Sequence, residues 1–130
     1  MAIFEGNTAE VFINVTRSDS MFFHFAINPS GAYWAAQHIK DQPEPLSQAW
    51  GHAARLEQHG WTAEIAIPWS MLGLSGPPAA ATPAPAPDTY APRPAPPVRV
   101  NLGRARPQAN EYSAWSPVAR GFVEPENFGT

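Results

Sequence analysis

The sequence reads TAEVFINVT over residues 8–16 and SMFFHFAI over residues 20–27. In both stretches apolar residues recur with the period of two that is typical of a β-strand with one face toward a core. In the first stretch Val11 points toward that core and Glu10 points the other way. The polar residues 17–19 lie between the stretches and favour a tight turn. The pattern therefore predicts an antiparallel hairpin.

Beyond the hairpin, turn residues and alternation predict more strands. Residues 28–31, Asn-Pro-Ser-Gly, form a turn, because proline restrains φ and glycine accepts a positive φ. Further strands are expected at 33–37, 61–67, 98–105 and 112–116. Residues 49–58 fit either a helix face or a strand paired with 61–67, and we prefer the strand.

Prolines indicate where these elements end. Two of them predict a loop over residues 40–47, since proline cannot donate a backbone hydrogen bond to a sheet. Pro68 ends the strand before it and suits the first position of a single helical turn at 69–72. A tight turn is expected at 125–128.

Residues 76–97 are the one low-complexity segment. They hold nine of the 16 prolines and seven alanines, and nothing in them can build a core. This composition predicts an extended, disordered insertion in a surface loop; the other interpretation is a protein-docking or spacer segment. Neither flank has enough strands to close a sandwich alone, so residues 1–130 are expected to form a single domain.

The fold class follows from about seven short strands with turns between them and almost no helix. It is all-β, an antiparallel β-sandwich of the immunoglobulin-like or jelly-roll-like kind. The net charge is −3 and no basic patch is present, so nucleic acid is not an expected partner. No apolar run approaches the roughly 20 residues of a membrane helix, so no membrane insertion is expected. The absence of cysteine excludes thiol catalysis and disulfides.

Side chains with catalytic potential are scattered. Glycoside cleavage needs two carboxylates held roughly 5–10 Å apart, and no spacing singles out a pair among the eleven acids. The four histidines lack a short metal-ligand spacing, and no serine lies in a nucleophile-elbow context. We therefore expect a binding domain and not an enzyme. Five Trp, seven Phe and three Tyr are many for so short a chain, and flat aromatic faces can cover the C–H patches of sugars.

Four stretches, in this order, carry a family resemblance. They are FEGNTAEVFI at 4–13, GWTAEIAIPW at 60–69, VRVNLGRAR at 98–106, and EYSAWSP at 111–117 followed by FVEPENFG at 122–129. Together they resemble family 9 carbohydrate-binding modules, which are non-catalytic sandwiches often attached to xylanases and related glycoside hydrolases. The resemblance implies that this chain binds a mono- or oligosaccharide. It would target a glycoside hydrolase or a surface polysaccharide-utilisation protein to sugar, in the extracellular space or the periplasm.

The resemblance also implies a sugar site. In the family two tryptophans clamp a terminal sugar, and their positions fall on Phe4 and Phe122. The smaller rings cover less of a sugar, which weakens binding by about 1 kcal/mol. Glu10 matches a carboxylate that accepts sugar hydroxyl groups. Further polar contacts are expected from Asn28, Asn101 and Arg104, the last because its planar guanidinium reaches paired hydroxyls.

The chain departs from the family at several points. An arginine and a glutamine used by sugar binders fall on Ala26 and Gly103. Family members carry several strands before the stretch that begins here, so we expect an N-terminally incomplete sandwich with unpaired edges. In the full-length protein a catalytic domain or barrel is the expected neighbour. Calcium is common in the family, but no acidic loop here has its ligand spacing, so no metal is assigned.

Two other interpretations stay open. Related sandwiches hold haem through Met, His or Lys ligands. Met21, Met71, His24 and Lys40 are present, without the spacing of an axial pair. By its place in the strand, His24 is expected to be solvated or hydrogen-bonded. The chain could also be a structural domain of a larger surface protein, with no ligand of its own.

Overall fold

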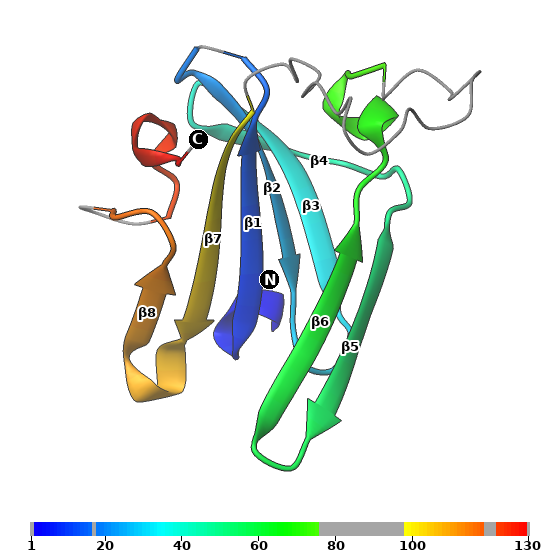
Figure 1. The fold of residues 1–130 in the computed structure, drawn as a ribbon, viewed down its shortest axis with the longest axis vertical. Coiled ribbons are helices and arrows are strands. Elements are labelled where there is room, and N and C mark those ends of the chain that lie inside the picture. The colour runs from blue at the N-terminus through cyan, green and yellow to red at the C-terminus, as the bar shows by residue number, and fades with distance from the viewer. Residues whose placement is uncertain (1, 17, 76–97, 119–121, 130) are drawn as a thin grey trace, which may run out of the picture.

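The computed structural model describes residues 2–16, 18–75, 98–118 and 122–129. In these residues eight strands form two antiparallel sheets, and no α-helix is present (Figure 1). The larger sheet has the order β4-β3-β2-β1-β7-β8, and β5 and β6 form the second sheet. The strands are β1 (Thr8–Asn14), β2 (Met21–Ile27), β3 (Tyr33–Ile39), β4 (Gln42–Pro45), β5 (Gly51–Glu57), β6 (Gly60–Ala66), β7 (Arg99–Arg106) and β8 (Glu111–Ala114). The predicted all-β, sandwich-like fold is confirmed. The insertion predicted at 76–97 lies outside the described residues.

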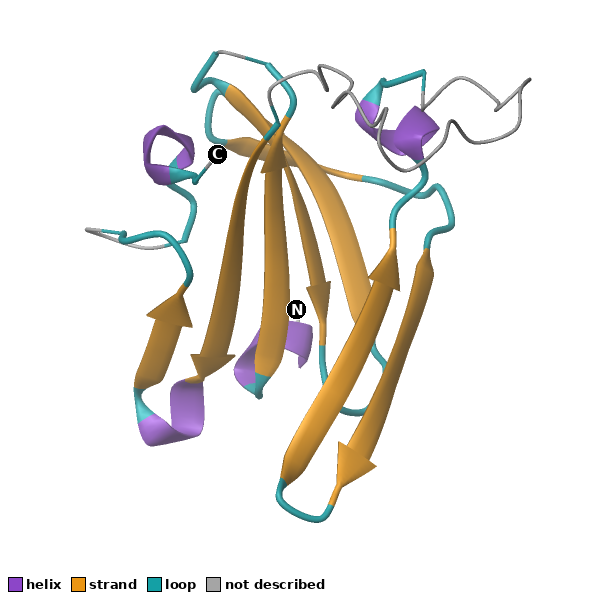
Figure 2. Ribbon diagram, viewed as in Figure 1, coloured by secondary structure: helices purple, strands orange, loops and turns teal. Residues whose placement is uncertain are grey.

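Short 3-10 turns account for the helical residues. They are η1 (Ala2–Glu5), η2 (Trp69–Leu72), η4 (Pro107–Ala109) and η5 (Pro125–Asn127). Figure 2 shows them beside or between the strands and never within a sheet. The predicted turn at 69–72 is confirmed as η2, which Gly73 closes with a φ of +70°. That conformation favours glycine because it has no Cβ.

The predicted hairpin of β1 and β2 lies in the middle of the larger sheet. Phe12 of β1 is opposite His24 of β2 on one side and Asn101 of β7 on the other. Alternate residues of a strand point to the same face, so this register decides which side chains share a face of the sheet.

The loop predicted over residues 40–47 is wrong in part, because β4 lies within it. Lys40 and Asp41 both have positive φ, of 49° and 64°, as the central residues of a type I′ hairpin turn require. That turn folds β4 back on β3, where His38 is opposite Pro43. Prolines are tolerated in β4 because it is the edge strand, with no further strand to receive a hydrogen bond.

Residues 49–58 form a strand, as preferred, and not a helix. β5 pairs with β6 through all seven residues, from Gly51 opposite Ala66 to Glu57 opposite Gly60. The hairpin lies across one face of the larger sheet (Figure 1). A core fills the space between the two sheets. Its buried members are Ile13, Phe23, Phe25, Ala35, Trp50, Met71 and Leu72, with Ile65 and Ile67 of the hairpin side packed against it.

The opposite face of the larger sheet is also buried, which strand alternation did not predict. Every β2 residue from Phe22 to Ile27 is buried, and Phe12 is fully buried on the face expected to meet solvent. The reason lies outside the strands. Phe4 of η1 and Phe128 near the C-terminus pack their rings on this face, against His24 and Phe12 respectively.

Candidate binding site

The buried second face carries aromatic and ionisable side chains together. The register places Glu10 and Phe12 of β1, Phe22 and His24 of β2, and Trp34 and His38 of β3 on it. We call this surface the aromatic face. It is the side of the larger sheet away from β5 and β6, whose side chains pack on the core of the other side.

Glu10 and His24 form a buried pair at the centre of the aromatic face. Glu10 Oε2 lies 2.8 Å from His24 Nε2, and the Thr8 hydroxyl donates to Glu10 Oε1 over 2.8 Å. Glu10 is 7% exposed and His24 is 6% exposed. A buried carboxylate is tolerated only with such partners, since losing water without replacement costs several kcal/mol. The pair therefore fixes the orientation of both side chains.

His38 extends this polar centre toward the edge of the sheet. Its ring stacks on Phe22 at 4.4 Å and lies 5.6 Å from the ring of His24. Burial, and to a lesser extent the nearby His24, lower the pKa of His38 to about 4, while Asp41 opposes the shift. The imidazole is therefore neutral at physiological pH.

The two expected clamp residues lie on the aromatic face, on either side of one stacked pair. Phe12 and His24 stack with ring centroids 4.3 Å apart. Phe4 contacts His24 at 5.9 Å, and Phe122 contacts Phe12 at the same distance. Trp34 packs edge-on against Phe4 at 5.4 Å. The half-buried rings of Phe4 and Phe122 thus pack at the two ends of a layer in which Glu10 and His24 are buried.

Gly103 explains how Phe122 reaches this position. A Cβ built on Gly103 would lie 2.9 Å from Cδ2 of the Phe122 ring. That is closer than real Cβ atoms approach a neighbour, so the ring needs a residue without a side chain beneath it. The glutamine that the family resemblance places at Gly103 would occupy the space that Phe122 fills here.

Three of the expected sugar contacts are engaged elsewhere: Asn28 lies in a turn, Arg104 lies on the other face, and Asn101 lies on the aromatic face but is fully buried. Asn28 accepts hydrogen bonds from the backbone of Ser30 and Ala32 and so stabilises its own turn. Asn101 has no exposed surface, and its amide bonds the backbone of Ser116 on both sides. The side chains of Asn28 and Asn101 therefore stabilise the backbone, the first in its own turn and the second next to Ser116.

Arg104 points to the other face of the sheet, since it is opposite Ala9 in a register that puts Glu10 opposite Gly103. There it pairs with Glu111 at 3.5 Å and lines a cleft with Trp61. Arg104 and Glu10, both expected to contact sugar, therefore lie on opposite faces of the larger sheet, because Arg104 and Gly103 are neighbours in a strand and face opposite ways.

Two residues of the aromatic face escaped sequence reasoning. They are Trp34 and His38. Their places on this face depend on the register of β2 and β3, in which Phe22 is opposite His38 and Ala26 is opposite Trp34. The alternation of Trp34, Ala36 and His38 is a signal for a shared face. It does not say which residues of β2 lie beside them.

The structure separates the candidate haem ligands. Met21 and Met71 belong to the core between the sheets, on the far side of the larger sheet from His24. Lys40 lies in the turn between β3 and β4. Among the described residues, no group of three or more His, Cys, Asp or Glu side chains is arranged to hold a metal ion.

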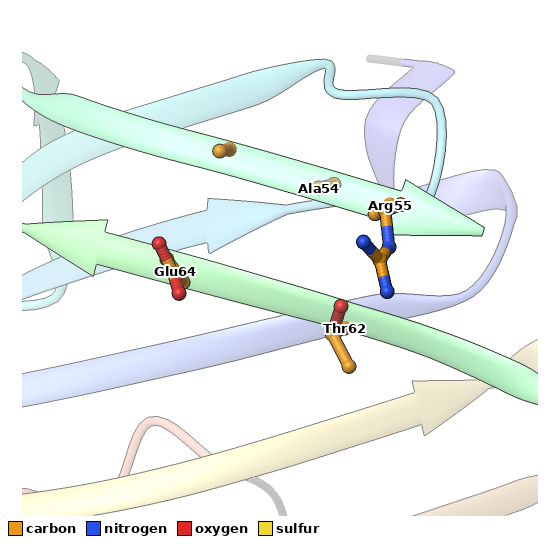
Figure 3. Close-up of a pocket in the computed structure, with 5 residues that line it drawn as sticks. Ala54, Arg55, Thr62 and Glu64 are labelled. Carbon is orange, nitrogen blue, oxygen red and sulfur yellow. The ribbon is translucent and has the colours of Figure 1, made fainter. Parts of the chain in front are cut away.

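The hairpin of β5 and β6 carries a separate cleft on its own surface. Ala54, Arg55, Thr62 and Glu64 line it (Figure 3). Arg55 forms an ion pair with Glu57 at 2.9 Å, and both side chains are exposed. Figure 3 shows Arg55 and Glu64 well separated along the strands, so the cleft lacks the converging polar groups of a binding site.

Within the described part of the chain, no helix is long and apolar enough to cross a bilayer. Searches for similar proteins found no family model, no curated protein and no solved structure that matches this chain.

Proposed function

We propose that the chain binds carbohydrate, without catalysis, on the aromatic face. The observation that carries this proposal is the position of Phe4 and Phe122. They come from the two ends of the described chain and lie on one face, on either side of the stack beside Glu10. A sugar ring has apolar C–H faces and a polar rim, so rings flanking a carboxylate match both of its surfaces.

Glu10 has capacity left for a ligand. A carboxylate offers about four lone-pair sites, and Thr8 and His24 use one on each oxygen. A sugar hydroxyl can donate to a remaining site, and the fixed orientation of Glu10 lowers the entropic cost of that bond. The aromatic face therefore combines a preorganised acceptor with flat apolar rings.

The strands of the larger sheet bring a single carboxylate to this face, which favours binding over cleavage. Among the strands of the larger sheet, Glu10 is the only acidic residue whose register places it on the aromatic face. Hydrolysis of a glycoside by the usual route needs a second carboxylate across the sugar. We expect weak, millimolar affinity, because Phe4 and Phe122 already bury part of their surface against Trp34, His24 and Phe12.

Titration calorimetry with xylose, glucose, cello-oligosaccharides and xylo-oligosaccharides tests the proposal. We expect binding to the native chain and a loss of about 5- to 150-fold in Phe4→Ala and in Phe122→Ala, since each removes one apolar wall worth roughly 1–3 kcal/mol. Trp69→Ala is the matched control, because Trp69 is an exposed aromatic residue of η2 on the other side of the sheet. The absence of heat at millimolar sugar, or binding unchanged in both Phe variants, would refute the proposal.

A further inference from the structure

Two buried nitrogen atoms on the aromatic face lack a hydrogen-bond partner. They are Nδ1 of His24 and Nε2 of His38, and they are the only such side-chain atoms in the described residues. Most buried polar atoms in proteins are paired, so two orphans on neighbouring rings need a physical explanation. We propose that His24 and His38 together bind a divalent transition-metal ion such as Zn²⁺ or Cu²⁺.

The setting of His24 is that of a metal ligand. A ligating histidine usually donates its other ring N–H to a carboxylate, which fixes the ring and makes the ligating nitrogen more basic. His24 Nε2 lies 2.8 Å from Glu10 Oε2, and this contact leaves Nδ1 as the lone-pair nitrogen. Thr8 in turn holds Glu10. The carboxylate therefore positions His24 and is not itself a ligand.

The spacing of the two rings fits one shared ion. Two imidazoles bound to a tetrahedral ion through bonds of about 2.0–2.1 Å have ring centres about 5–5.5 Å apart. The centroids of His24 and His38 are 5.6 Å apart, with 37° between the ring planes. The distance between the ring centres is therefore close to the value that one shared ion requires.

Neutral imidazole nitrogen selects the kind of ion. It suits zinc, copper and nickel, whereas magnesium and calcium prefer oxygen ligands. Phe12 and Trp34 contact His24, and Phe22 contacts His38, so the two rings lie in an apolar setting that strengthens such bonds. Two protein ligands leave the remaining positions of the ion open, for water or for a group of a bound molecule.

Metal titration of the whole 130-residue chain tests this inference. We expect one Zn²⁺ per chain by competition with a chromophoric chelator, and a Cu²⁺ paramagnetic resonance spectrum with hyperfine coupling from two imidazole nitrogens. His38→Gln should lose one of these couplings and weaken binding more than Glu10→Gln does. Glu10→Gln should weaken binding by about 10–100-fold, the usual effect of losing a carboxylate behind a ligand.

His59→Gln is the matched control, because His59 is exposed in the turn between β5 and β6, and that hairpin lies on the opposite side of the larger sheet from the aromatic face. It should bind metal as the native chain does. The inference is overturned if the native chain binds no metal, or if His38→Gln binds metal as tightly as the native chain. Either result would leave a buried water molecule as the partner of the two nitrogens. Metal binding and sugar binding are measured separately, so failure of one leaves the other standing.

Discussion

At the scale of single residues, the aromatic face depends on side chains that fit only one arrangement. Gly103 supports the ring of Phe122 from below, and Phe12 stacks on His24 in the middle. Glu10 is buried but bonded on both oxygens. Apart from the bond between Thr8 and Glu10, these contacts join residues that are distant in the chain, so single substitutions here report on the tertiary structure directly.

Gly103→Ala is expected to displace Phe122. The added Cβ meets the ring at 2.9 Å, and relief of that clash should cost about 1–2 kcal/mol of unfolding free energy and weaken sugar binding. Urea unfolding measures the loss. The double variant Gly103→Ala with Phe122→Ala should lose less than the sum of the single changes. Gly6→Ala is the control, because a Cβ there meets nothing within 4 Å. If the double variant loses as much unfolding free energy as the two single variants together, then Gly103 and Phe122 do not contact each other in the way described.

The low pKa of His38 predicts a loss of stability in mild acid. The unfolded chain binds a proton on His38 near pH 6.5, whereas the folded metal-free chain binds it only near pH 4. The unfolded state therefore holds more protons in this window, and stability must fall as the pH falls from about 6.5 to 4. We expect about 1–2 kcal/mol, less than the full shift implies, because the ring is only half buried.

Urea unfolding at several pH values, with a chelator present, measures this slope. His38→Gln removes the titrating group, so its curve should be flatter than that of the native chain between pH 6.5 and 4. Equal slopes in the two proteins would show that other groups cause the loss, the carboxylates among them.

At the scale of elements, the two sheets differ in how well they are supported. β1 pairs with a strand on each side, and most of its residues are buried. In the described residues β5 and β6 pair only with each other, and most of their residues are exposed. Local opening costs least where few apolar contacts and exposed hydrogen bonds occur together. The hairpin is therefore the weaker element.

Amide hydrogen exchange tests this difference. The backbone amide protons of β5 and β6 should exchange faster than those of β1 and β2. The free energy of opening should be lower for the β5–β6 hairpin by several kcal/mol. The comparison uses residues paired inside a ladder, such as Ala54 opposite Ala63 and Val11 opposite Phe25. Equal protection in both hairpins would mean that the molecule opens only as a whole.

At the scale of the whole molecule, two sheets of unequal size share one core and leave apolar surface in solvent. Leu56 is 71% exposed, Trp115 is 61% exposed and Trp69 is 49% exposed. Such side chains contribute little to folding when they stay in water. The larger sheet has to supply most of the stability, through cores on both of its faces.

We therefore expect the chain to melt below about 60 °C, within the ordinary range of small domains. Circular dichroism across a concentration series measures this, and the series shows whether association through the exposed side chains raises the midpoint. A cooperative, concentration-independent transition above about 60 °C would contradict the expectation.

Much of the fold was predictable because the signals for it are local. Alternation found β1, β2 and β6, whereas residues 49–58 fitted either a helix or a strand and were preferred as a strand. The turn at 28–31 and the single helical turn at 69–72 followed from residues within a few positions of each other. The strand β4 was missed because its prolines are tolerated only at a sheet edge. Edge position is a property of the sheet and not of the segment.

The amino-acid sequence by itself determined the all-β class, the antiparallel hairpins and the presence of aromatic residues near both ends. Only the tertiary structure decided which of these residues meet. It placed Phe4, Glu10 and Phe122 on one face of the larger sheet and Arg104 on the other. It also brought the rings of His24 and His38 to within 5.6 Å of each other. The physical reason is that register and the covering of the second face arise from contacts between distant segments, and alternation within one strand carries no information about them.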